Sequence, residues 1–206
     1  MHKKSFTLME LMVVVIIIGI LATVGLPTYR NFIEDQRATV CQTNLRALKT
    51  ALDIYVMEHD RIPAGLSKLP FEYIQRAYAQ VLQEKGAWKI KLAYFMADRE
   101  DRGMAYATGN ELSLRNDLAK GDIKLITCPS DSTPPAAGGR SYGLYSVLAN
   151  MTSQQYRDLS SNTLLIADCE TDTFSTTSQL TRRHKYNNYP CTLGIKKDGI
   201  VSRYYN

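Results

Sequence analysis

The first 58 residues carry a continuous pattern of apolar positions that predicts one long helix. From Phe6 to Leu26 the chain is an apolar run whose single charge is Glu10. With a rise of about 1.5 Å per residue, a run of about 21 residues makes a helix about 31 Å long, enough to cross a bilayer core. We therefore expect a transmembrane helix at residues 6–26.

Beyond Pro27 the apolar residues recur in steps of three and four, which is the period of a helix with one buried face. Pro27 removes one backbone hydrogen bond, but the pattern resumes at once, so we expect a kink rather than an end. The helix should continue over residues 27–58 and present an apolar stripe to a folded domain: Tyr29, Ile33, Val40, Cys41, Leu45, Leu48, Leu52, Tyr55 and Val56.

The remaining residues, 59–206, predict one globular domain of the α+β class. Pro63 and Gly65 break the long helix, and residues 66–85 have the pattern of a second amphipathic helix. Short apolar segments predict an antiparallel sheet with strands at 123–127, 141–148, 163–167, 192–195 and 200–204, and with weaker candidates at 92–96 and 111–114. Residues 196–199 should form a hairpin turn in which Gly199 supplies a positive φ.

Length and charge restrict the class of protein. About 150 residues follow the long helix, enough for one hydrophobic core. The net charge is +5 at pH 7, to which Lys3 and Lys4 contribute. A mild basic excess usually reflects a solvated surface, so we expect no nucleic-acid partner. Lysines ahead of the apolar run predict a cytoplasmic N-terminus and an exported C-terminal domain.

Glu10 is the residue that an ordinary membrane anchor does not explain. A carboxylate in an apolar helix costs about 2.5–3.5 kcal/mol at the centre of a membrane, and less near the interface. A plain signal anchor and an interfacial acid that reaches the headgroups are both alternatives. A cleaved signal peptide is a third, although the run is long for one and leads directly into a charged helical pattern.

Residues 3–10 closely resemble the processing site of type IV pilins and type II secretion pseudopilins. In that family a prepilin peptidase cuts before a phenylalanine and methylates the new amine. The resemblance implies a leader peptide at residues 1–5, cleavage between Ser5 and Phe6, and N-methylation of Phe6. Glu10 then occupies the fifth mature position, where the family has glutamate, and Pro27 is the family's helix-kinking proline. The family usually has glycine where this chain has Ser5.

The resemblance implies a structural filament subunit without catalytic activity or a cofactor. Cleavage exposes an ammonium on Phe6, and the Glu10 carboxylate of a neighbouring copy can pair with it, because an unpaired charge in a low-dielectric helix bundle is heavily penalised. The implied partners are further pilins or pseudopilins, the prepilin peptidase, an assembly platform protein and its ATPase. The implied location is the inner membrane, crossed once, and then the filament; a secretion pseudopilin, a pilus and a DNA-uptake system are not distinguished.

The C-terminal half more loosely resembles pseudopilin-like proteins with a CPSD segment and an R-H followed by D-G and valine. The matching segments are 128–131, 141–143, 166–168, 183–184 and 198–201. Here the spacing from His184 to Asp198 is longer, and no histidine follows Gly199. Both resemblances imply a pilin-like long helix packed on a C-terminal sheet.

Residues 139–143 match the G-x-S-x-G pattern of hydrolases, and Asp168 and His184 follow in hydrolase order. A membrane-anchored hydrolase that uses Ser141, Asp168 and His184 is therefore an alternative. A nucleophile elbow needs an apolar strand before the serine and a helix after it. Here a Pro/Gly-rich loop precedes Ser141 and a strand pattern follows, so we expect no catalytic residue at this position.

The cysteines and acidic residues offer further candidate chemistry. Cys169 and Cys191 lie near the ends of C-terminal strands and are the preferred disulfide pair, with free buried thiols as the alternative. Three cysteines and His184 lack the short spacing of a zinc site, so we expect no metal at Cys128, Cys169, Cys191 and His184. A loop with three acids could bind Ca²⁺, but an ordinary acidic turn is the simpler explanation for Asp168, Glu170 and Asp172.

Tyrosines gather near the C-terminus, at Tyr186, Tyr189, Tyr204 and Tyr205. Together with Arg182 and Arg183 they could stack on sugars or single-stranded DNA. A minor pilin that binds DNA or polysaccharide at a filament tip is therefore the third alternative, although tyrosine is also common simply because it favours strands.

Overall fold

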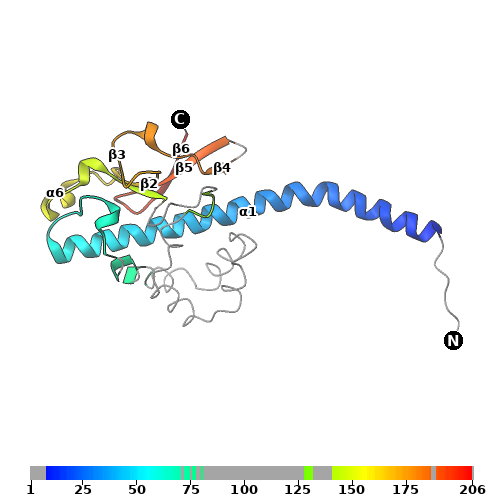
Figure 1. Cartoon of the computed structure of the whole chain (residues 1–206), viewed down its shortest axis with the longest axis horizontal. Helices are drawn as coiled ribbons and strands as arrows, with labels where there is room; N and C mark the ends of the chain where they lie inside the picture. Colours follow the sequence, from blue (N-terminus) through cyan, green and yellow to red (C-terminus); the bar gives the residue numbers. More distant parts are fainter. Residues whose placement is uncertain are drawn as a thin grey trace.

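The computed structural model describes residues 8–70, 72–74, 76–77, 80, 128–131, 141–186 and 189–205. One long helix, α1 (Leu8–His59), packs its C-terminal half against a small sheet domain, while its N-terminal half extends away from the domain as a stalk (Figure 1). The predicted α+β class and pilin-like long helix are confirmed. Ser5 and Phe6 lie outside the described residues, so their processing stays a prediction.

Helix α1 runs unbroken across position 27, as the resumed apolar pattern predicts. The outer part of the predicted stripe is fully buried, with Val40, Cys41, Leu45, Leu48, Leu52 and Val56 at most 4% exposed. Tyr29, nearer the stalk, is 58% exposed. The boundary between the covered and uncovered parts of the helix therefore falls between these positions.

The helix ends in a turn that ties it to the domain. Asp60 has a φ of 56°, which reverses the chain after His59. The Ile62 amide then donates to the Met151 carbonyl at 2.8 Å.

The second amphipathic helix, predicted at residues 66–85, is described only in part. A short 3₁₀ helix, η1 (Leu66–Lys68), lies where it was predicted to begin. Residues 72–74, 76–77 and 80 are helical, and the predicted contacts Leu66, Leu69, Ile74 and Ala77 are buried. Tyr78, Val81 and Leu82 lie outside the described residues.

Within the described residues, six strands form one sheet with the order β3-β1-β2-β5-β4, and β6 also pairs with β5. They are β1 (Tyr142–Tyr145), β2 (Leu164–Asp168), β3 (Thr173–Phe174), β4 (His184–Tyr186), β5 (Tyr189–Lys196) and β6 (Val201–Tyr204). The predicted strands pair antiparallel, as expected, and the sheet is mixed only because β3, which was not predicted, runs parallel to β1. The short elements η3 (Ser146–Leu148), α6 (Ser153–Asp158) and η4 (Thr177–Gln179) connect the strands.

Four of the predicted strands lie in described residues, and each is present with shifted ends. In the segment predicted at 141–148, the strand ends at Tyr145 and η3 follows it. The strand predicted at 192–195 is the middle of the longer β5. Gly199 has a φ of +84° in the turn between β5 and β6, as predicted. Strand β4 was not predicted. The candidate strands at 92–96, 111–114 and 123–127 lie outside the described residues.

The two faces of the sheet have separate cores. Leu144, Ile166 and Ile195 join the large cluster built on the C-terminal half of α1. Ala167, Cys169, Phe174 and Leu180 form a smaller cluster. Because neighbouring residues of a strand point to opposite faces, Asp168 lies on the face of Ile166, and Cys169 on the face of Ala167. This alternation decides which polar side chains meet under α1.

Candidate functional site

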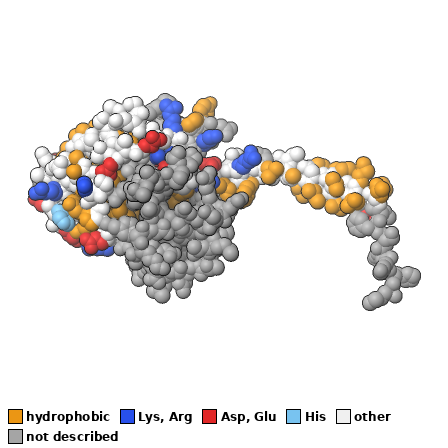
Figure 2. All heavy atoms as spheres, in the orientation of Figure 1, with side chains coloured by type: hydrophobic (Ala, Val, Ile, Leu, Met, Phe, Trp, Pro, Cys, Tyr) orange, Lys and Arg blue, Asp and Glu red, His pale blue; other side chains and the backbone are white. Residues whose placement is uncertain are grey.

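The stalk of α1 presents apolar side chains to its surroundings along its whole length. Large apolar residues from Leu8 to Leu26 are 45–83% exposed, and hydrophobic atoms dominate the stalk in Figure 2. By length and composition this helix could cross a membrane. Keeping these side chains in water would cost on the order of 10–20 kcal/mol, as much as the whole stability of a typical domain. The stalk must therefore be covered by lipid or by protein.

Glu10 lies on this exposed apolar stretch, in the first turn of α1. Its side chain is exposed, like those of its neighbours Met9 and Leu11. The predicted counter-charge, the amine of Phe6 in another copy, lies outside the described residues. The role of Glu10 in assembly therefore stays a prediction.

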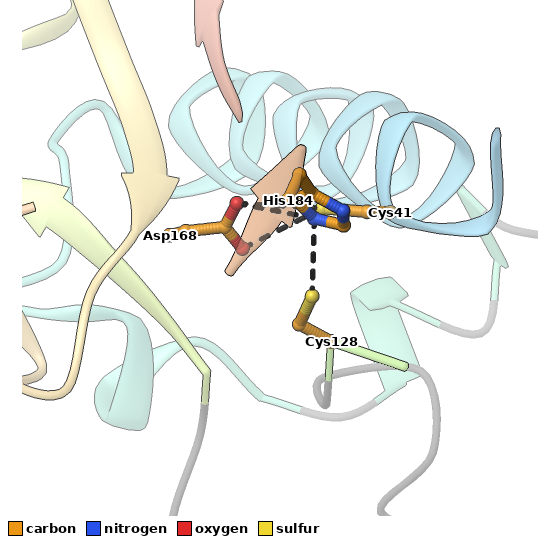
Figure 3. A group of neighbouring side chains, drawn as sticks. All are labelled: Cys41, Cys128, Asp168 and His184. Carbon is orange, nitrogen blue, oxygen red and sulfur yellow. Dashed lines mark hydrogen bonds and ion pairs between the residues drawn. The ribbon is translucent and has the colours of Figure 1, made fainter. Parts of the chain in front are cut away.

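The second candidate site is a buried cluster under the sheet, to which four separate segments contribute one side chain each. Figure 3 shows the cluster with Cys41 on α1, Cys128 in the segment 128–131, Asp168 at the end of β2 and His184 at the start of β4. Each side chain is at most 2% exposed. One donor atom from each residue lies within 4.8 Å of all the others.

Short contacts connect the four side chains. His184 Nε2 lies 3.2 Å from Cys128 Sγ and 3.5 Å from Asp168 Oδ2. Cys41 Sγ donates to Asp168 Oδ1 at 3.5 Å. These atoms are typical metal ligands, since thiolate, imidazole and carboxylate all bind Zn²⁺.

Further polar groups hold the cluster in place. The Leu193 amide donates to Asp168 Oδ2 at 3.1 Å, and Ser130 Oγ lies 3.3 Å from His184 Nδ1. Arg183 and Asp131 form an adjacent ion pair, with 3.0 Å between Nη2 and Oδ2. Because Asp131 and Ser130 belong to the same short segment as Cys128, this ion pair fixes the segment beside His184.

Burial and mutual contacts change the protonation of the cluster. Burial raises the pKa of the Cys41 thiol well above its ordinary value. Burial also opposes ionisation of Cys128, but hydrogen bonds with Cys41 and His184 outweigh it and lower the pKa of that thiol. For His184 burial favours the neutral ring, yet the hydrogen bonds with Asp168 and Cys128 prevail and raise its pKa to about 10. The His184 ring is therefore charged at neutral pH beside the Asp168 carboxylate.

The hydrolase arrangement of Ser141, Asp168 and His184 does not form. Ser141 Oγ donates to Asp131 at 2.8 Å, whereas the ring nitrogens of His184 contact Cys128, Ser130 and Asp168. Ser141 immediately precedes β1 and is followed by a strand, whereas a nucleophile elbow is followed by a helix. The histidine and the aspartate predicted for the triad do meet, but without the serine that would act as nucleophile.

The predicted disulfide between Cys169 and Cys191 is not formed, and all four cysteines are free. Cys191 pairs with His184 across β5 and β4, which places it on the face of the buried cluster, whereas Cys169 belongs to the smaller core on the other face. Cys169 and Cys191 therefore point to opposite faces of the sheet. Nearness of both residues to strand ends was a poor guide, because it takes no account of this alternation.

The three acids considered for Ca²⁺ have separate surroundings. Asp168 is buried in the cluster, and Glu170 is exposed. Asp172 accepts hydrogen bonds from the amide and the hydroxyl of Ser67, at 2.6 and 2.7 Å. Its carboxylate thus fastens η1 to the loop after β2.

Two members of the rejected zinc set, Cys128 and His184, do come together, but with Cys41 and Asp168 in place of Cys169 and Cys191. Sequence spacing could not reveal this set, because Cys41 and Asp168 are 127 residues apart. One feature of the sequence did point to this set. Cys41 lies in the predicted buried stripe of α1, so a possible metal ligand was already expected on the face of the helix that contacts the sheet.

Comparison with known proteins identifies the family. A family model described as the prokaryotic N-terminal methylation motif matches residues 1–26. The type IV major pilin protein PilE1 of Neisseria gonorrhoeae is 36% identical over 149 residues, which cover 66% of this chain and 78% of that protein. The chain belongs to the type IV pilin family. The matched motif of this pilin includes Ser5, Phe6 and Glu10.

Other relatives of this pilin match over shorter stretches. The competence protein ComGC of Halalkalibacterium halodurans is 37% identical over 71 residues, which cover 34% of this chain and 70% of that protein. The type IV major pilin protein PilA of Myxococcus xanthus is 45% identical over 70 residues, which again cover 34% of this chain. The pilin spans only 32% of the length of PilA and 35% of that of the major alpha-pilin of Moraxella bovis. No solved structure matches the chain significantly.

Proposed function

We propose that this member of the family is a structural filament subunit, a pilin or type II secretion pseudopilin, that is drawn from the inner membrane into a helical fibre. The division of α1 into two halves carries the proposal. Its C-terminal half is buried under the sheet, while its N-terminal half is apolar and uncovered. Lipid would cover the stalk before assembly, and the stalks of sister subunits would cover it afterwards.

The proposed maturation follows the methylation motif at residues 1–26. A prepilin peptidase cleaves between Ser5 and Phe6 and methylates the amine of Phe6. The N-terminus faces the cytoplasm in the precursor, and the sheet domain lies in the periplasm or outside the cell, in line with Lys3 and Lys4 ahead of the span. An assembly ATPase and a platform protein then add the subunit to the fibre.

Glu10 is the proposed assembly residue. Four residues separate Phe6 from Glu10 in sequence, which corresponds to a rise of about 6 Å in a regular helix. In a bundle of packed stalks the Glu10 carboxylate can pair with the amine of an adjacent subunit. Because an uncompensated charge is costly in an apolar bundle, this pairing favours assembly over a solitary subunit and sets the axial register.

Mass spectrometry of the membrane-extracted protein tests the maturation. We expect a chain that begins with N-methylated Phe6. A chain that retains Met1 in cells with an active prepilin peptidase would instead support a plain membrane anchor.

Replacing one charge tests the assembly. The Glu10→Leu variant should remain in the membrane, since the substitution makes the span more apolar, but should form few or no filaments. Glu34→Leu is the matched control, because it removes a carboxylate from α1 outside the apolar stretch, where Glu34 pairs with Arg37 at 2.6 Å. Filaments from Glu10→Leu in the amount given by the parent would overturn the proposed role of Glu10.

A further inference from the structure

We propose that this pilin holds one Zn²⁺ ion in a closed structural site made by four buried side chains: Cys41, Cys128, Asp168 and His184. The site would fasten the long helix to the sheet. It does not depend on filament assembly, since all four donors belong to one chain and lie in its folded domain. Figure 3 shows these side chains converging from α1, the segment 128–131, β2 and β4.

The spacing of the donor atoms fits a tetrahedral zinc ion. With Zn–S bonds of about 2.3 Å and Zn–N or Zn–O bonds of about 2.0–2.1 Å, tetrahedral angles place neighbouring ligand atoms about 3.4–3.8 Å apart. The observed separations are 3.2 Å from Cys128 Sγ to His184 Nε2, 3.5 Å from His184 Nε2 to Asp168 Oδ2, and 3.7 Å from Cys41 Sγ to the same Asp168 Oδ2. These three separations lie within a few tenths of an ångström of the tetrahedral values, and every pair of donor atoms lies within 4.8 Å, so side-chain shifts of up to about 1 Å would suffice to bind the ion.

The chemistry of the donors selects the kind of ion. Ca²⁺ and Mg²⁺ prefer shells of oxygen ligands, whereas two sulfurs and an imidazole favour Zn²⁺. A dication would also offset most of the negative charge of two thiolates and a carboxylate. Because four protein donors leave no open position and each is buried, the site is structural rather than catalytic.

The groups around the donors orient them as protein metal sites require. Ser130 Oγ contacts Nδ1 of His184, which leaves Nε2 directed at the cluster. The Leu193 amide donates to Oδ2 of Asp168, which holds this oxygen 3.5 Å from His184 Nε2 and 3.7 Å from Cys41 Sγ. The hydroxyl of Tyr142 hydrogen-bonds with Cys41 and accepts a hydrogen bond from Asn44 at 3.3 Å.

The position of the site suggests what the ion does. Cys41 is the only donor on α1, and the other three belong to the sheet and the segment beside it. Binding a metal at a site that exists only in the folded chain adds to the stability of that fold. The ion would therefore oppose separation of the helix from the sheet.

A disulfide between Cys41 and Cys128 is the competing arrangement. It would use the two sulfurs but would leave Asp168 and His184 buried without a shared ligand. The two arrangements predict different masses under non-reducing conditions, since a disulfide removes two hydrogens from the chain.

The full chain, purified in detergent with a phosphine reductant and without a chelator, provides the test. Elemental analysis should find about one zinc per chain in the parent and in Cys169→Ser. Cys169 is the matched control, because it is a buried free cysteine that points to the other face of the sheet. Zinc content should fall about tenfold or more in Cys41→Ser and Cys128→Ser. X-ray absorption at the zinc edge of the parent should show two sulfurs at about 2.3 Å and two nitrogens or oxygens at about 2.0–2.1 Å.

Three results would overturn the site. They are a parent that takes up no zinc after incubation with ZnCl₂, equal zinc in the parent and in both cluster variants, and a Cys41–Cys128 disulfide in a second preparation of the parent made without reductant. If a serine variant does not fold, the sulfur count at the zinc edge of the parent decides the question by itself. A shell of nitrogen and oxygen alone would reject the proposal.

Discussion

Arg183 and Asp131 form a nearly dry ion pair, with 3.0 Å between Nη2 and Oδ2 and side chains that are 6% and 8% exposed. Arg183 also donates to the Ser141 carbonyl at 3.0 Å. The pair thus joins the segment that carries Cys128 to the start of β1 and to the residue before His184. Two of these places carry members of the cluster, Cys128 and His184, so the ion pair helps to keep these two side chains together.

Arg183→Ala should therefore destabilise the fold by about 3–5 kcal/mol, because it leaves the Asp131 carboxylate buried without its cation. Denaturant unfolding of the full chain in detergent micelles, followed by circular dichroism, measures the change. The neighbouring Arg182 is exposed, so Arg182→Ala is a matched control that should change the free energy of unfolding by less than about 0.5 kcal/mol. Equal effects of the two substitutions would show that the ion pair does not hold the segment.

The sequence predicts the long helix and much of the sheet because both rest on local periodicity. The stripe from Val40 to Val56 and the turn at Gly199 follow from helix spacing and from the positive φ of that turn. The parallel pairing of β1 with β3 could not be predicted in this way. Strand β3 has only two residues, too few to show an alternating pattern, and its position beside β1 depends on the rest of the fold. No local pattern marks such a strand.

The buried cluster could be predicted only in part for a similar reason. His184 and Cys128 each stand in a recognisable segment, but nothing local connects either of them to Cys41. Their meeting depends on the register of β2 against β5 and on which turn of α1 lies beneath Asp168. The wrong disulfide prediction has the same origin, since a one-residue shift in a strand moves a side chain to the opposite face.

Glu58, near the end of α1, provides a prediction about pH. Hydrogen bonds from the Tyr73 hydroxyl, at 2.6 Å, and from Arg76, at 3.1 Å, lower the pKa of its carboxyl. A lowered pKa in the folded state means that this contact stabilises the fold at neutral pH and that the stabilisation is lost as the pH falls through the folded-state pKa.

Tyr73→Phe should therefore raise the pKa of Glu58 towards its ordinary value, since the first of the two donors is gone. At neutral pH the parent should have a larger free energy of unfolding than the variant. This difference should shrink as the solution is acidified, because protonated Glu58 gains less from the Tyr73 hydroxyl. Carbon-detected NMR titration of the Glu58 carboxyl measures the first effect, and acid unfolding the second. Tyr29→Phe, which removes a hydroxyl from an exposed position of the same helix, should leave the titration of Glu58 unchanged. A Glu58 pKa that is identical in parent and Tyr73→Phe would contradict the assignment.

Ser141→Ala separates a structural serine from a catalytic one. The hydroxyl of Ser141 is buried and donates to the Asp131 carboxylate at 2.8 Å. Removing a hydrogen bond to a charged group should cost about 1.5–3 kcal/mol of stability and should leave the yield of filaments unchanged. Ser175→Ala, at an exposed position, is the control for both measurements.

The two roles of Ser141 predict opposite patterns. If the serine supports the Asp131–Arg183 pair, Ser141→Ala lowers the midpoint of denaturant unfolding, and the variant still assembles below that midpoint. If the serine is a nucleophile, the midpoint of denaturant unfolding stays near that of the parent, while a hydrolase activity present in the parent is lost in Ser141→Ala. The second pattern would require His184 to leave Cys128 and Asp168 and turn towards Ser141, and it would therefore also exclude the proposed zinc site.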